Sequence, residues 1–156
     1  MIYAFLYAPI ALIVFFSFNS GRYAMDWQGF STQWYGIAFS NELIVRALKT
    51  SLTIAFATAF LSTAIGTLAA MGLERTKGPT RQAFDALVYI AVMVPGVVIG
   101  IATLIAFVTL FDVVNPVLEQ LIGMRAQMGS WTVTAAHVLF NIGIVILIVR
   151  ARLAGT

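Results

Sequence analysis

Cysteine is absent from this sequence of 156 residues, and histidine occurs once. The absence of cysteine excludes a disulfide framework, a thiolate metal site and a cysteine nucleophile, and a single histidine argues against a histidine-rich metal site. Charged residues are scarce, at 10% of the chain, whereas an ordinary soluble domain has about 25%. Hydrophobic residues make up 61%, and the mean hydropathy is +0.96. This balance excludes a cytosolic globular enzyme, a nucleic-acid-binding module and a disordered tail.

The motifs that soluble enzymes use are missing too. No glycine-rich phosphate loop ends in Lys-Ser or Lys-Thr, so the chain is not expected to bind ATP in the Walker manner. No serine has histidine and aspartate neighbours in a triad pattern. All six acidic residues are expected in loops: Asp26, Glu42, Asp112 and Glu119 on the outer side, Glu74 and Asp85 on the inner side. The sequence therefore predicts a membrane protein with no catalytic site, cofactor or metal of its own.

Four long apolar segments dominate the chain. A transmembrane helix needs about 20 mostly apolar residues to cross about 30 Å of hydrocarbon, and uncharged runs cover residues 2–18, 50–73, 86–111 and 131–149. We therefore expect an all-α, polytopic bundle of membrane helices. The first run has no basic residue before it and no small-x-small cleavage site after Phe18, so a span or anchor is favoured over a signal peptide.

The basic residues near the ends of these runs predict the orientation. The short connection over residues 74–85 and the segment after the fourth run are rich in basic residues, whereas the connection before the fourth run holds only Arg125. The residues of the two basic groups are Arg75, Lys77 and Arg81, and Arg150 and Arg152. By the positive-inside rule both groups face the cytoplasm. Four spans then place both chain ends in the cytoplasm.

Short interfacial helices are expected in the outer loops. Ser40 and Asn41 are suitable N-cap residues for a helix that leads into the second span. Asn115 followed by Pro116 is typical of a cap and a first-turn proline, and Gly123 is a suitable terminator for the helix that follows.

Small residues recur every three or four positions along the second run, at Ala55, Ala59, Ser62, Gly66 and Ala70. In lipid, such a stripe lets two helices approach closely, and we interpret it as a packing surface.

Pro95 and Gly96 interrupt the third run. Proline removes a backbone N–H and kinks a helix, and the carbonyl group that it frees is tolerated where the helix lines a cavity. The kink is interpreted either as a bend over a substrate path or as a purely structural bend.

Two further features have a structural and a functional interpretation. His137 and Asn141 share one face of the fourth helix, where they form an interhelical hydrogen bond or serve a function. An aromatic cluster follows the first run and is either an interfacial belt or a stacking surface for a cationic ligand. Its residues are Trp27, Phe30, Trp34, Tyr35 and Phe39.

Several motifs resemble one family of membrane proteins. Residues 7–22 (YAPIALIVFFSFNSGR) and 27–35 (WQGFSTQWY) resemble the start of the permease subunits of spermidine/putrescine-type ABC importers. In these, a first span ending in Ser-Phe-Asn precedes a Trp-x-Gly-Phe-(Ser/Thr)-x-x-Trp-Tyr segment. Residues 48–75 resemble the next span of the family, and residues 95–104 (PGVVIGIATL) resemble part of its third.

The resemblance implies a six-helix permease in the lipid bilayer of the bacterial inner membrane, with no nucleic-acid partner. The implied partners are a second permease subunit, a cytoplasmic ATPase dimer that binds the ATP, and an extracytoplasmic solute-binding protein. The family's coupling loop, with its Glu-Ala-Ala...Gly signature, and the last two spans are expected beyond Thr156, so we expect a chain truncated after the fourth helix. The candidate residues of the substrate path are Trp34, Pro95, Gly96 and Asn141.

One departure from the family concerns the substrate. Polyamine members often carry an acid directly after the proline of the third helix, where this chain has Gly96. An unpaired charge at the bilayer centre costs several kcal/mol, so a polyamine requires a counter-charge from the partner subunit, from the missing helices or from Asp112. Otherwise the substrate is another small solute.

Two other classes of function remain open. The first is an ion-coupled secondary transporter or channel, for which only His137 is available as an ionisable group within a span. The second is a non-transporting four-helix assembly protein.

Overall fold

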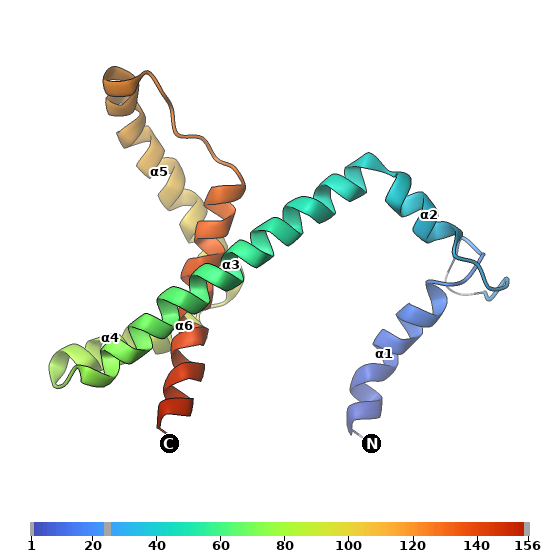
Figure 1. Ribbon diagram of the computed structural model, residues 1–156, viewed down its shortest axis with the longest axis horizontal. Helices are drawn as coiled ribbons and strands as arrows, with labels where there is room; N and C mark the ends of the chain where they lie inside the picture. Colours follow the sequence, from blue (N-terminus) through green and yellow to red (C-terminus); the bar gives the residue numbers. More distant parts are fainter. Residues whose placement is uncertain (1, 24–25, 155–156) are drawn as a thin grey trace. The chain divides into compact units, whose positions relative to one another are not determined.

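The computed structural model describes residues 2–23 and 26–154, and all the regular elements of these ranges except an isolated β-bridge are helices (Figure 1). They are α1 (Ile2–Phe16), α2 (Gln33–Ser40), α3 (Glu42–Arg75), α4 (Pro79–Met93), α5 (Gly96–Ile122) and α6 (Ser130–Leu153). The predicted all-α fold class is confirmed. The chain divides into two compact units, residues 1–50 and residues 51–156, and each is described by itself.

The first unit is organised around Asn19, whose side chain is 1% exposed. Its Nδ2 donates to the carbonyl oxygens of Tyr23 (3.2 Å) and Asp26 (2.7 Å), and its Oδ1 accepts from the backbone N–H groups of Gly21 (3.2 Å) and Gln28 (2.8 Å). A buried polar group is stable only when its hydrogen bonds are made. Asn19 therefore closes the segment after α1 into a compact loop.

Aromatic side chains pack around this loop. Trp27 stacks on Phe15 with ring centroids 4.5 Å apart, and Phe30 stacks on Phe18 at 5.4 Å. These contacts occupy one face of each ring. Trp27 and Phe30 of the predicted aromatic cluster are thus packed on phenylalanine rings. The short helix α2, which carries Trp34, Tyr35 and Phe39, was not expected from the sequence.

The cap expected at Asn41 is present, but the helix that it starts is not short. Oδ1 of Asn41 accepts hydrogen bonds from the backbone N–H groups of Leu43 (3.0 Å) and Ile44 (3.3 Å). From Glu42 the helix runs without a break to Arg75. The expected interfacial helix is therefore the first turns of α3.

In the second unit, α6 lies against both α3 and α4. A Cβ built on Gly66 of α3 would come within 2.7 Å of Cγ1 of Val145, so the two helices approach closely at this point. Gly143 on α6 faces α4, where its built Cβ would lie 3.4 Å from Cγ2 of Val92, an ordinary van der Waals contact. Ser62, Gly66 and Ala70 are buried, which confirms this part of the small-residue stripe as a packing surface. Ala55 and Ala59, at its start, are exposed and line a hollow between α3 and α6.

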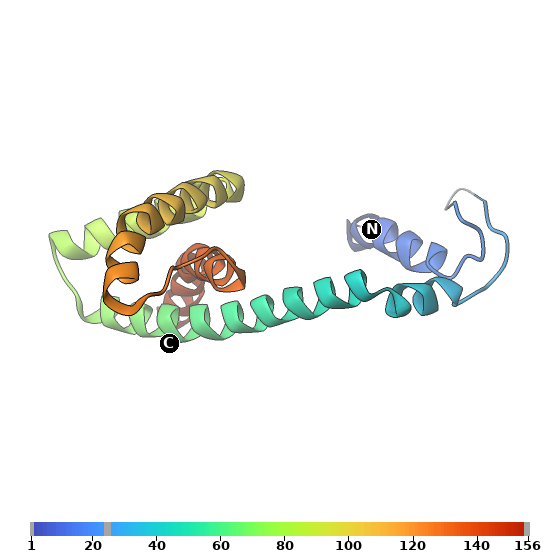
Figure 2. The same ribbon diagram turned by 90° about the horizontal axis from the view of Figure 1, so that it is seen from above.

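The third predicted span is not a single kinked helix. The chain leaves the helical conformation at Val94 (ψ 128°) and Pro95 (ψ 133°), and α4 and α5 run in different directions in both views (Figures 1 and 2). The residue before a proline is biased toward extended conformations, and Pro95 has no N–H to continue the ladder. A sequence interpreted as one helix over 86–111 is therefore divided between two.

Asn115 and Pro116 do not start a helix but lie inside α5. The side chain of Asn115 holds the connection to α6 instead, because its Oδ1 accepts from the N–H of Ala126 (2.7 Å) and its Nδ2 donates to the carbonyl of that residue (3.2 Å). The left-handed Gly123 (φ 67°) then ends α5 as expected.

The expectation that all the acids lie in loops was wrong. Among the six, only Asp26 lies outside a helix, while the others occupy α3, α4 and α5: Glu42, Glu74, Asp85, Asp112 and Glu119.

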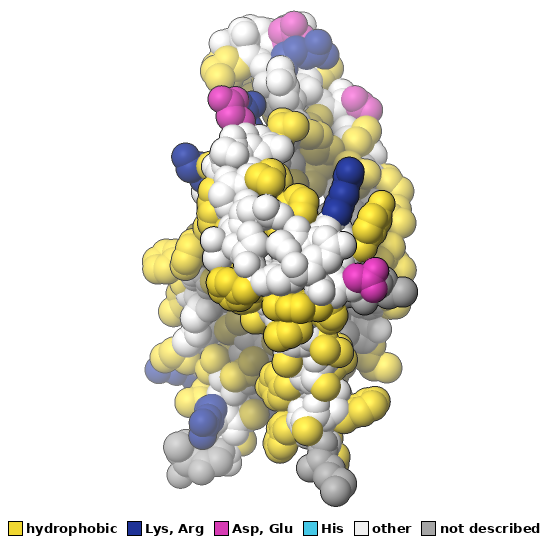
Figure 3. Space-filling view, turned by 90° about the vertical axis from the view of Figure 1, so that its right-hand side faces the viewer, with side chains coloured by type: hydrophobic (Ala, Val, Ile, Leu, Met, Phe, Trp, Pro, Cys, Tyr) yellow, Lys and Arg dark blue, Asp and Glu magenta, His cyan; other side chains and the backbone are white. Residues whose placement is uncertain are grey.

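Three of the described helices, α3, α5 and α6, are long and apolar enough to cross a membrane, and α1 is a shorter apolar helix. Their large side chains are widely exposed: Phe56 is 73% exposed and Ile105 60%. Apolar side chains also cover much of the face shown in Figure 3. A helix that is apolar all round is stable when protein or lipid covers it, so this exposure agrees with a membrane protein.

The close approach at Gly66 generates a first prediction. Replacing Gly66 by Ala forces a Cβ against Val145, and we expect the free energy of unfolding to fall by about 1–3 kcal/mol, as for other overpacked sites. The measurement is unfolding in detergent followed by circular dichroism. Gly72→Ala on the same helix is the control, because its Cβ would have no neighbour within 4 Å. An equal effect of both substitutions would contradict the assigned contact.

The loop around Asn19 generates a second prediction. Asn19→Ala leaves buried backbone groups without partners, at about 1–3 kcal/mol each, so the loop should open more often. Arg22 is the only basic residue in the first 45, and we expect trypsin to cleave after it at least about fivefold faster, since cleavage follows local opening. Asn41→Ala, which removes only the cap of α3, should leave the rate at Arg22 unchanged.

Candidate functional site

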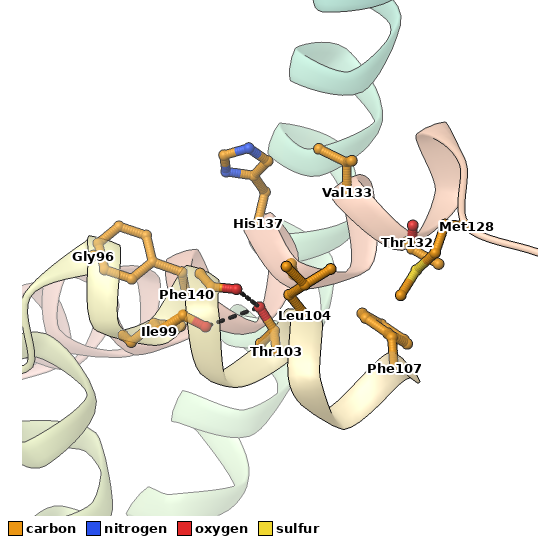
Figure 4. A pocket seen from close by; sticks show the side chains of 12 residues that line it. Gly96, Ile99, Thr103, Leu104, Phe107, Met128, Thr132, Val133, His137 and Phe140 are labelled. Atoms are coloured by element: carbon orange, nitrogen blue, oxygen red, sulfur yellow. Dashed lines mark hydrogen bonds between the residues drawn. The ribbon is translucent and has the colours of Figure 1, made fainter. Parts of the chain in front are cut away.

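Two hollows flank α6, and both are lined by His137. The first lies between α5 and α6 and has a volume of about 440 Å³. Figure 4 shows its lining side chains, among them Phe107 and Phe140, with Gly96 at the start of α5. Thr103 also lines it, but its hydroxyl donates to the carbonyl oxygens of Ile99 (2.8 Å) and Gly100 (3.0 Å). This hollow is therefore mainly apolar.

The second hollow lies between α3 and α6 and has a volume of about 550 Å³. It differs from the first because hydroxyl, amide and imidazole groups line it. Its polar residues are Ser51, Thr58, Ser62, His137 and Asn141. Nδ2 of Asn141 donates to the backbone carbonyl of His137 (2.8 Å), so its carbonyl oxygen is left to act as an acceptor.

Trp34 belongs to the first unit and lines a hollow of about 420 Å³ there. Its indole Nε1 donates to the backbone carbonyl of Asn19 at 3.0 Å, which fixes α2 against the loop. Arg22 lines the same hollow, and its positive charge opposes the binding of a cation.

A cluster of four charged side chains joins α3, α4 and α6 at one end of the second unit. Arg150 donates a hydrogen bond to Asp85 and lies 3.7 Å from Glu74 (Nε to Oε1). Arg81 lies 3.6 Å from Glu74 (Nη2 to Oε1) and 4.0 Å from Asp85 (Nε to Oδ2). The two positive and two negative charges balance, and the side chain of Arg150 is 17% exposed. The cluster brings both predicted cytoplasmic basic groups to the same end.

The structure does not bring the predicted path residues together in one hollow. Gly96 lines the hollow between α5 and α6, and Asn141 lines the hollow between α3 and α6. Pro95 lies between α4 and α5, where its carbonyl accepts from Val98 (2.9 Å). Trp34 lies in the other unit. Sequence reasoning missed Thr58, although its spacing of four residues from Ser62 places it on the small-residue face of α3.

Within the part of the chain that the structure describes, no group of three or more His, Cys, Asp or Glu side chains could hold a metal ion. Long apolar helices with hollows between them define an α-helical membrane protein.

The amino-acid sequence is similar to those of several known transport proteins. The chain is 33% identical over 154 residues to the spermidine/putrescine transport system permease protein PotC of Escherichia coli (strain K12) and 34% identical over 155 residues to PotC of Haemophilus influenzae. It is 34% identical over 154 residues to the putrescine transport system permease protein PotI of E. coli (strain K12). These matches cover 97–99% of the chain. No protein-family model matches.

Over nearly its whole length this chain is therefore a homologue of polyamine permease subunits, and the resemblance found in its motifs is confirmed. The chain spans about half the length of these relatives, at 53%, 55% and 51%.

The charged cluster generates a third prediction. In a double-mutant cycle with Arg150→Met and Asp85→Asn, we expect a coupling free energy of about 1 kcal/mol or more, because the pair is partly buried and shares a network. Arg125 and Glu119, whose side chains are 63% and 58% exposed, form the control pair, with an expected coupling of about 0–0.5 kcal/mol. Unfolding in detergent gives both values, and equal coupling would contradict the role assigned to the cluster.

Proposed function

We propose that this chain forms the membrane-spanning part of a permease subunit of an ATP-driven ABC importer, and that the transported solute is a polyamine such as spermidine or putrescine. The observation that carries the proposal is the similarity to polyamine permease subunits over 97–99% of the chain. The hollows between the apolar helices of the second unit are compatible with a path for a small solute.

The chain itself is a transport subunit and not an enzyme. It contains no phosphate-binding loop, so ATP is bound and hydrolysed by a cytoplasmic ATPase dimer. A second permease subunit supplies the other half of the path, and an extracytoplasmic solute-binding protein delivers the solute.

The proposed location is the bacterial inner membrane, with the charged cluster at the cytoplasmic end. Further basic residues lie near the cluster in sequence: Arg75 at the end of α3, Lys77 in the turn before α4, and Arg152 in the last turn of α6. A concentration of basic residues favours the cytoplasmic side. Both chain ends would then be cytoplasmic.

The proposed path residues are Gly96 and Asn141, one in each hollow of the second unit, with Pro95 setting the direction of α5. Trp34 is kept as a proposed path residue of the first unit, although Arg22 lines the same hollow. Because its N–H is bound to Asn19, only its ring face is available for a solute.

The fourth prediction concerns the energy source of transport. In proteoliposomes that contain the complete transporter, uptake of radiolabelled putrescine should require ATP and should stop when the phosphate-loop lysine of the ATPase is replaced. Collapse of the proton gradient by an uncoupler should leave uptake unchanged. Uptake that a proton gradient drives without ATP would contradict the proposal and favour an ion-coupled transporter.

A further inference from the structure

We propose that the polar hollow between α3 and α6 binds one protonated amino group, together with its neighbouring methylene groups, through uncharged oxygen acceptors. This inference rests on the proposed function, since it names the part of the solute that the hollow holds.

The hollow is formed by the angle at which the two helices cross. Gly66 lets α3 touch α6, with Cγ1 and Cβ of Val145 2.7 and 2.8 Å from its built Cβ. The residues that line the hollow on α3 all precede Gly66, and those on α6 precede or include Val145. Both helices run toward the charged cluster, so they separate on the side of their N-termini, and the polar side chains lie in the space between them.

Thr58 has an unused hydroxyl group at this hollow. The residue is 7% exposed, and its Oγ1 is buried without a hydrogen-bond partner among the described residues. Hydroxyls in helices commonly donate to the carbonyl four residues earlier, as those of Ser62 (2.6 Å), Thr76 (3.1 Å) and Thr134 (2.8 Å) do here. Because an unpaired buried hydroxyl costs free energy, a ligand that bonds to Thr58 is favoured.

The free hydrogen-bonding positions of Ser62 and Asn141 in the hollow are mainly acceptors. The hydroxyl of Ser62 donates its hydrogen bond to the carbonyl of Thr58, and the amide of Asn141 donates to the carbonyl of His137. Both keep an oxygen with free lone pairs. A surplus of acceptors selects a ligand rich in donors, and an ammonium group has three N–H donors. Apolar neighbours such as Ile54 and Val133 suit the methylene groups.

None of the described residues that line this hollow is acidic. Neutral dipoles can replace the hydration shell of a cation without a formal counter-charge, as carbonyl oxygens do in ion-selective pores. Such a site holds a cation more weakly than a carboxylate does, and passage through a pore requires that each site release its ion. A charge-free acceptor site is therefore suited to transit.

The test measures binding of radiolabelled putrescine to the complete transporter without its solute-binding protein, in lipid nanodiscs. We expect n-butylamine, which has N–H donors, to compete with putrescine. Tetramethylammonium, which carries a charge but no N–H, should compete at least about tenfold less well. Thr58→Val and Asn141→Leu should each weaken binding roughly 3- to 10-fold, the range expected for one lost hydrogen bond. Asn141→Asp should strengthen binding, because it adds a counter-charge.

Matched controls lie on exposed positions of α3. Thr63→Val removes a hydroxyl and Ala64→Leu adds volume, both outside the hollow, and should change binding less than twofold. Ala59→Leu, which fills the hollow, should weaken binding as Thr58→Val does. The inference is overturned if the wild-type complex binds no putrescine, if tetramethylammonium competes as well as n-butylamine, or if the hollow variants bind like the controls.

A parallel measurement of ATP-dependent putrescine uptake separates the two proposals. If the hollow variants bind putrescine normally and the wild-type complex shows ATP-dependent uptake, the assignment of the hollow is overturned but the proposed function is not. Absence of ATP-dependent polyamine uptake by the wild-type complex overturns the proposed function itself.

Discussion

The close approach of α6 to its neighbours is the contact on which the second unit depends. Lipid offers no hydrophobic attraction between helices, so their association relies on van der Waals packing and interhelical polar contacts. Gly66 provides close packing, since a Cβ at this position would come within 2.7 Å of Val145, and Gly143 lies in ordinary van der Waals contact with α4. At one end, Arg150 adds a polar contact to Asp85 and Glu74. Contact at the crossing and separation beyond it produce the polar hollow.

The break at Pro95 has the second largest consequence. It ends α4 while that helix packs against Gly143, and it lets α5 leave in another direction. The aromatic group of Phe107, Phe111 and Trp131, with centroids 5.5–6.0 Å apart, connects α5 to the start of α6. The apolar hollow lies between these aromatic contacts and Gly96. Together with the crossing of α3 and α6, this break leaves α6 with an apolar hollow against α5 and a polar hollow against α3.

Several elements of this fold could be predicted from local pattern. The apolar runs predicted the long helices, Asn41 predicted the start of α3, and Gly123 predicted the end of α5. The small-residue stripe predicted a packing surface, which is present from Ser62 to Ala70. Predictions failed where the same short sequence motif is compatible with two different local structures. Asn115-Pro116 has the pattern of a helix start, but the asparagine binds Ala126 and the helix continues. The short helix α2 has no amphipathic pattern of its own and is held by Trp34 and Tyr35, which contact residues far away in the sequence.

The sequence by itself determined that this chain is helical and suited to lipid, because hydropathy and length are sums over neighbouring residues. Its motifs were also enough to indicate its relatives. Only the tertiary structure decided that Thr58 and Asn141 line one hollow, that Gly96 lines another, and that Arg150 joins Glu74 and Asp85. Each of these depends on the angle and register at which helices cross. Those quantities follow from side-chain packing between segments distant along the chain, which no local pattern encodes.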